Sequence, residues 1–154
     1  MFKINDKFLL GIIAAILASI PLNIIEYIGH QLNFNHYTIW DIATSLYFPE
    51  IDAPYGFIIG LVTHYITIGL LGVIVVYLLY LTGTDYYLIK GLAVSLAAWI
   101  LVFGIVIHTP LVTLEPITTA EYMFHLILHA IFGPLTAWVA LKLAEPELLD
   151  SHAY

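Results

Sequence analysis

The sequence predicts an all-α integral membrane protein, a four-transmembrane-helix up-down bundle with one short amphipathic helix at the interface in its first outer loop. Of its 154 residues, 62% are hydrophobic and only 10% are charged, and the mean hydropathy is +0.98. A soluble domain has about 25% charged residues. Four apolar segments, at about 8–28, 55–81, 87–107 and 122–143, reach the roughly 20 residues that a bilayer requires. Short connections favour antiparallel neighbours, so we expect one membrane domain covering residues 1–154.

The composition also excludes several classes of function. The chain has no arginine and only four lysines, which leaves no basic face for nucleic acid. It has no cysteine, which excludes disulfides, thiolate metal sites and covalent haem attachment. The sequence contains neither a Gly-x-Ser-x-Gly nor a Ser-x-x-Lys motif, so it gives no support to common hydrolase chemistry. Whether the protein is an enzyme stays open.

The lysines predict the orientation. Lys3 and Lys7 precede the first segment, Lys90 opens the third and Lys142 closes the fourth, so all of them fall on one side of the membrane. By the positive-inside rule, both termini are cytoplasmic and the protein is a multi-pass protein of the cell membrane. We interpret the first apolar segment as a retained helix, because no clear cleavage site follows it.

The first segment carries a stripe of small and polar residues. Gly11, Ala15 and Ser19 are followed by Asn23, Glu26 and His30, at spacings that place all six on one side of a helix. The small residues are typical of a packing seam between membrane helices. An unpaired carboxylate at this depth would be costly, which makes Glu26 a candidate functional residue. Pro21 is expected to kink this helix.

The first outer loop predicts a short amphipathic helix within residues 37–48. Trp40 and Tyr47 fall on its apolar face and would anchor it in the headgroup layer. Thr44 and Ser45 fall roughly opposite, facing water. His36 is expected at the exposed start of this helix, solvated.

The second and third segments each add one histidine. His64 lies nine residues after Tyr55, about 14 Å into the membrane and near its midplane. Gly56 and Gly60 permit close contact with a neighbouring helix. His108 marks the end of the third helix, where a histidine also complements the helix dipole.

The fourth segment carries the densest group of ionisable residues. Glu121, His125 and His129 recur every four residues and therefore share one side of a helix. His125 and His129 lie about 5 and 10 Å deep, counted from Tyr122. Pro134, next to Gly133, is expected to interrupt the hydrogen-bond ladder there.

These residues support a first hypothesis, a transition-metal site in the outer half of the bundle. Two histidines at i and i+4 can chelate one ion, and imidazole with carboxylate suits iron, zinc, manganese or copper. The candidate ligands are Glu26, His30, His64, His108, Glu121, His125 and His129.

A second hypothesis is b-type haem, held by His64 together with His125 or His129 from another helix. Electron transfer to a partner or a quinone would then be the function. The absence of arginine counts against this hypothesis, because no arginine is available to hold the propionates.

A third hypothesis involves no cofactor. The protein would be a membrane scaffold or assembly subunit, or an oligomeric channel or transporter with Glu26, His64 and Glu121 as a proton or ion path. Its partners would be the lipid bilayer and further copies of itself or another membrane complex. The sequence alone leaves these three hypotheses open.

Overall fold

The computed structural model describes residues 3–112, 114 and 116–149, and every regular element among them is helical. The helices are α1 (Lys7–Gln31), α2 (Ile39–Thr44), α3 (Gly56–Thr82), α4 (Tyr87–Trp99) and α5 (Thr119–Leu143). A π-helix, η1 (Ile100–Ile105), and a 3-10 turn, η2 (Val106–His108), continue α4. The helices α1, α3, α4 with its continuation, and α5 make four that are long and apolar enough to cross a membrane. The expected all-α architecture with four long apolar helices is confirmed.

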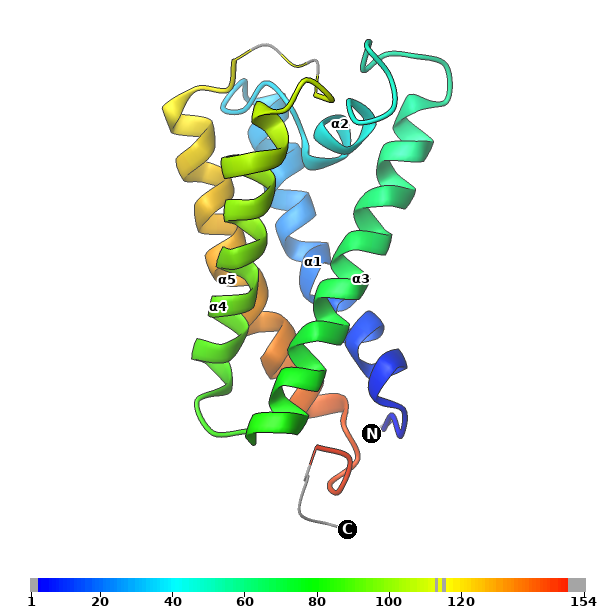
Figure 1. The fold of residues 1–154 in the computed structure, drawn as a ribbon, viewed down its shortest axis with the longest axis vertical. Coiled ribbons are helices and arrows are strands. Elements are labelled where there is room, and N and C mark those ends of the chain that lie inside the picture. The colour runs from blue at the N-terminus through cyan, green and yellow to red at the C-terminus, as the bar shows by residue number, and fades with distance from the viewer. Residues whose placement is uncertain (1–2, 113, 115, 150–154) are drawn as a thin grey trace.

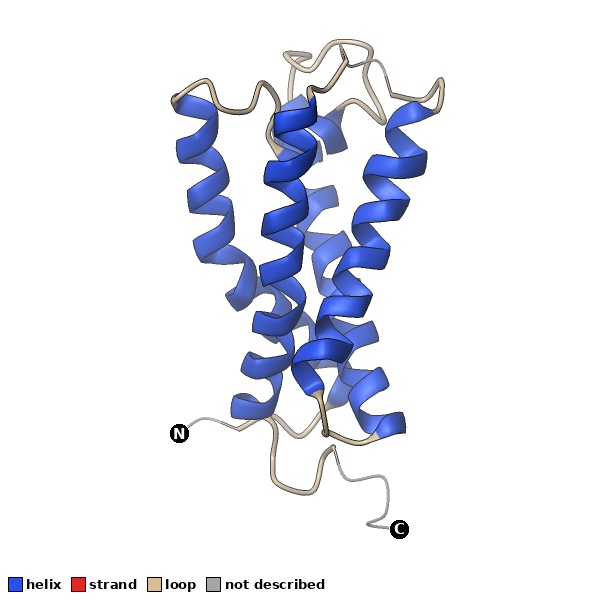
Figure 2. Cartoon of the chain, turned by 90° about the vertical axis from the view of Figure 1, so that its left-hand side faces the viewer, coloured by secondary structure: helices blue, strands red, loops and turns tan. Residues whose placement is uncertain are grey.

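The long helices alternate in direction, and the first and last described segments of the chain lie at one end of the bundle (Figure 1). We call this the terminal end, and the opposite end, which carries α2, the distal end. Helix α1 packs between α3 and α5, and α5 packs between α1 and α4. The remaining pair, α3 and α4, meet near the terminal end and diverge toward the distal end (Figures 1 and 2).

Glycines allow two of these helix pairs to touch backbone to backbone. A Cβ atom at Gly72 of α3 would collide with the carbonyl oxygen of Gly11 of α1. A Cβ atom at Gly133 of α5 would collide with the carbonyl oxygen of Gly91 of α4. These contacts are the close approach that small residues permit in membrane bundles.

The outward surface of the bundle is apolar. Large side chains that would normally be buried are about half exposed along every long helix, among them Ile24, Ile58, Ile66, Ile74 and Ile100. Soluble monomers rarely expose contiguous apolar surfaces of this kind, whereas lipid requires them.

Helix α2 buries the face that was expected to be polar and solvated. Thr44 and Ser45, predicted to face water, are each only 1% exposed. The hydroxyl of Thr44 lies 2.8 Å from the Trp40 carbonyl oxygen and 3.0 Å from that of Gly56, so it faces α3. Gly60 makes this possible, because a Cβ atom there would collide with Trp40 and Thr44. The hydroxyl groups of Thr44 and Ser45 can be buried because each donates a hydrogen bond to a backbone carbonyl oxygen.

The prolines do not end their helices. Pro21 lies inside α1 and Pro134 inside α5, and both helices continue past them. Packing against neighbouring helices lets membrane helices tolerate proline. The backbone departs from α-helical hydrogen bonding in η1, where Val106 N–H donates to the Leu101 carbonyl five residues back.

The first residues of the chain bind the end of α5. The Lys3 ammonium donates to the carbonyl oxygens of Lys142 and Ala144, each at 2.9 Å. Ile4 N–H donates to the Leu143 carbonyl at 2.8 Å. These donors satisfy carbonyl groups that a helix C-terminus leaves without partners.

Candidate functional site

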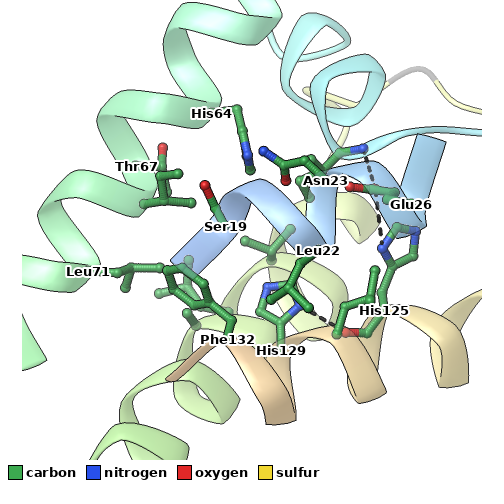
Figure 3. A pocket seen from close by; sticks show the side chains of 16 residues that line it. Ser19, Leu22, Asn23, Glu26, His64, Thr67, Leu71, His125, His129 and Phe132 are labelled. Atoms are coloured by element: carbon green, nitrogen blue, oxygen red, sulfur yellow. Dashed lines mark hydrogen bonds and ion pairs between the residues drawn. The ribbon is translucent and has the colours of Figure 1, made fainter. Parts of the chain in front are cut away.

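The bundle contains a cavity of about 200 Å³ among α1, α3, α4 with η1, and α5. Much of its wall is aliphatic, and its polar lining includes Ser19, Asn23, Glu26, His64, His125 and His129. In Figure 3, Glu26 and His125 lie on one side of the cavity, with Leu71 and Phe132 on the other. The cavity thus combines an apolar part with a cluster of ionisable side chains.

Glu26 connects three helices. Its side chain is buried, and Oε1 accepts a hydrogen bond of 2.7 Å from the backbone N–H of Ile39, the first residue of α2. The same oxygen lies 3.6 Å from Nδ1 of His125 on α5. That distance is longer than a hydrogen bond but places the two side chains in contact. The predicted carboxylate therefore has its partner, supplied by the last helix.

Phe103, in the π-helix η1, positions His125. The two rings stack with centroids 4.7 Å apart and an interplanar angle of 27°. Phe103 also meets His129 edge-on at 5.9 Å. Both histidine rings therefore pack against one buried phenylalanine.

His129 and His64 have ring nitrogens available to a ligand. Nδ1 of His129 lies 2.9 Å from the His125 carbonyl oxygen. A carbonyl only accepts, so Nδ1 carries the proton and Nε2 of the neutral ring is an acceptor. Nε2 of His64 is buried and has no hydrogen-bond partner among the described residues. Both rings line the cavity.

Glu121, in contrast, is a structural carboxylate. It accepts from the backbone N–H and hydroxyl of Thr118, at 2.8 and 2.7 Å, as part of a capping box at the start of α5. It also accepts from His36, through the backbone N–H at 2.6 Å and the ring Nδ1 at 3.1 Å. His36 was expected to be solvated. Its side chain is 70% exposed, but its ring is held by Glu121.

His30 and His108 also lie away from the cavity. Nδ1 of His30 is 3.1 Å from the Asn35 carbonyl oxygen, and Nε2 of His108 is 3.4 Å from the Tyr122 hydroxyl. Of the seven predicted residues, the cavity brings together Glu26, His64, His125 and His129. In the described part of the chain, no three His, Cys, Asp or Glu side chains are placed to share a metal ion.

Among the described residues, the cavity lining includes the carboxyl group of Glu26 but no Lys or Arg. The lysines are used at the terminal end, where Lys90 binds the Thr82 and Gly83 carbonyls and Lys7 lies over the ring of Tyr80.

Sequence reasoning missed two contributors to this site. Phe103 and the π-helix around it lie in an apolar run that carries no sequence signal for irregular backbone. Thr67, one helical turn from His64, also lines the cavity. No protein-family model, curated protein or solved structure matches this chain, so its own geometry has to support any assignment.

Proposed function

We propose that this chain is a multi-pass membrane protein that binds a small ligand in the cavity among its long helices. Glu26, His64, His125 and His129 would form hydrogen bonds with the ligand and exchange protons with it. The observation that carries this proposal is the unpartnered Nε2 of His64, which lines the same cavity as the Glu26–His125 pair. An unsatisfied buried polar atom costs about 1–3 kcal/mol, and a ligand that bonds to it would remove that cost.

The same proposal places the protein in the cell membrane with both termini in the cytoplasm. The lysines support it, because all of them lie at the terminal end or bind groups there. The cavity then lies in the outer half of the bilayer. Ionisable residues inside a membrane segment mark functional sites by default.

Proton exchange is the chemistry that this cluster supports. A carboxylate and an imidazole 3.6 Å apart can hold one proton on either partner. Histidine is suited to this role because its ordinary titration range lies near neutral pH. Stacking on Phe103 fixes the orientation of the His125 ring, so the pair has a defined geometry.

A bound transition metal is a second candidate, favoured by one observation. The Nδ1 of His129 donates to a backbone carbonyl, which is the second contact that typically orients a metal-binding histidine. His64 and Glu26 would complete the ligand set with iron, zinc, manganese or copper after their side chains move together. Haem b has less support, since the cavity of about 200 Å³ is smaller than the roughly 300–1,000 Å³ of sites for drug-sized ligands.

One preparation tests both candidates. The untagged protein is extracted from native membranes without chelators and analysed by native mass spectrometry and by elemental analysis. We expect a bound organic mass in the wild type and in Ala97→Leu but not in Ala98→Leu, because Ala98 lines the cavity and Ala97 is exposed. Retention of that mass in Ala98→Leu, or its absence from the wild type, would contradict ligand binding. Stoichiometric metal that is lost in His129→Ala and kept in His108→Ala would establish the metal site instead.

A further inference from the structure

We propose that the ligand is an uncharged, single-ring amphiphile with a hydroxyl head group, of the alkylphenol class, and that it enters sideways from the bilayer between α3 and α4. This inference rests on the proposed function and adds the chemical class of the ligand and its route. Four features of the cavity carry it: its opening, its volume, its hydrogen-bonding groups and its charge.

The opening faces the side of the bundle. Thr67 on α3 and Leu101 on η1 both line the cavity, and both are exposed. They lie on the two elements that diverge toward the distal end (Figure 1). At the distal end itself, Ile39 lines the cavity and its N–H is bound to Glu26, while Thr44 of α2 packs against Gly60. A ligand would therefore arrive through the apolar flank of the protein, which suits a lipid-soluble molecule.

The volume limits the part of the ligand that enters to one ring. A cavity of about 150 Å³ lined by aliphatic and aromatic side chains is sufficient to bind benzene. This cavity holds about 200 Å³, which is enough for a six-membered ring with small substituents. An alkyl tail would remain in the opening, between Thr67 and Leu101.

The hydrogen-bonding groups call for a hydroxyl. Nε2 of His129 is an acceptor, because its Nδ1 carries the proton. Nε2 of His64 is unpartnered and accepts or donates according to its tautomer. A hydroxyl group can donate its one proton to Nε2 of His129 and accept from Nε2 of His64 in the tautomer in which that nitrogen carries the proton. An ether oxygen cannot donate and would leave the His129 acceptor unsatisfied.

The charges in the site select a neutral head group. The Glu26–His125 pair holds one proton between its two partners and therefore carries no net charge. Among the described residues that line the cavity, none is Lys or Arg. An ionic head group of either sign would thus lack a counter-ion in the cavity.

The test uses the full chain in nanodiscs of zwitterionic phospholipid, with octylphenol fluorinated on its ring as the probe. Fluorine NMR separates a bound resonance from the probe dissolved in lipid. We expect octylphenol to bind about 5- to 150-fold more tightly than its methyl ether, the range that follows from one unsatisfied buried acceptor. His129→Phe removes the acceptor, so this variant should bind octylphenol and its methyl ether with similar affinity. If His129 had a purely structural role, the substitution would weaken the binding of both compounds by the same factor.

Ala98→Leu should abolish the bound resonance and Ala97→Leu should keep it. Equal binding of phenol and ether by the wild type overturns the proposed ligand class without any variant. Displacement of octylphenol by octanoate or by octyltrimethylammonium overturns the neutral head group. In either case, a native ligand that is lost on Ala98→Leu would leave the proposed function intact. Unchanged octylphenol binding by Ala98→Leu would overturn the cavity as the site, and both proposals with it.

Discussion

Two glycines in long helices should respond oppositely to the same substitution. At Gly133, a Cβ atom would collide with the Gly91 carbonyl oxygen and with the hydroxyl of Ser95. A backbone atom cannot rotate away, so α4 and α5 must separate. Overpacking of this kind costs about 1–3 kcal/mol. Because alanine in a helix regains about 0.8–1.0 kcal/mol relative to glycine, we expect Gly133→Ala to lower the free energy of unfolding by up to about 2 kcal/mol.

Gly69 on α3 is the matched control. A Cβ atom there would have Ile12 side-chain atoms at 3.6 Å as its nearest neighbours, which is ordinary van der Waals contact. Only the propensity gain remains, so Gly69→Ala should raise the free energy of unfolding by about 0.5–1 kcal/mol. Reversible unfolding in mixed detergent micelles, followed by circular dichroism, measures both variants. A Gly133→Ala protein more stable than the wild type, as is expected of Gly69→Ala, would refute the backbone contact between α4 and α5.

Two further predictions concern the distal end and the orientation. Glu121→Ala should lower the free energy of unfolding by about 2 kcal/mol, because it removes a helix cap and the acceptor of His36, whereas Glu50→Ala, at an exposed loop position, should change it little. The Glu121→Ala variant should still bind octylphenol. Loss of octylphenol binding in this variant would show that Glu121 contributes to the ligand site. Because the chain has no cysteine, Asp52→Cys and Asp85→Cys each create a unique label site on opposite ends of the bundle. An impermeant maleimide should label Asp52→Cys in intact cells and Asp85→Cys only after permeabilisation, and the reverse pattern would overturn the orientation.

The sequence predicted most of the fold and four of the residues that line the cavity, because both follow from periodicity and depth. The expected segment 55–81 corresponds to α3, Gly56–Thr82, and the other long helices agree to within a few residues. Glu26, His64, His125 and His129 converge because their positions give them similar depths on neighbouring helices. Helical periodicity and depth along a helix depend only on local sequence, so they can be predicted without knowing the tertiary contacts.

Glu121 shows where periodicity misleads. It continues the His125–His129 stripe but falls at the third position of α5, where the helix needs a cap. Thr118-x-x-Glu121 is a capping-box pattern, so a sequence signal for its structural role was present. The orientation of α2 and the stacking of Phe103 depend instead on partners distant in the sequence, Gly60 and His125, and no local pattern contains them.

The pairing of the first helix with the last has a consequence for how this protein is made. Glu26 emerges from the ribosome in α1, and its partner His125 belongs to α5. The Lys3 contact to Lys142 likewise joins residues 139 positions apart. During synthesis, Glu26 can first be met only by the backbone N–H of Ile39, since α5 is the last helix to be made. A chain that stops before α5 therefore lacks both the imidazole partner of Glu26 and the carbonyl group of Lys142 that binds Lys3.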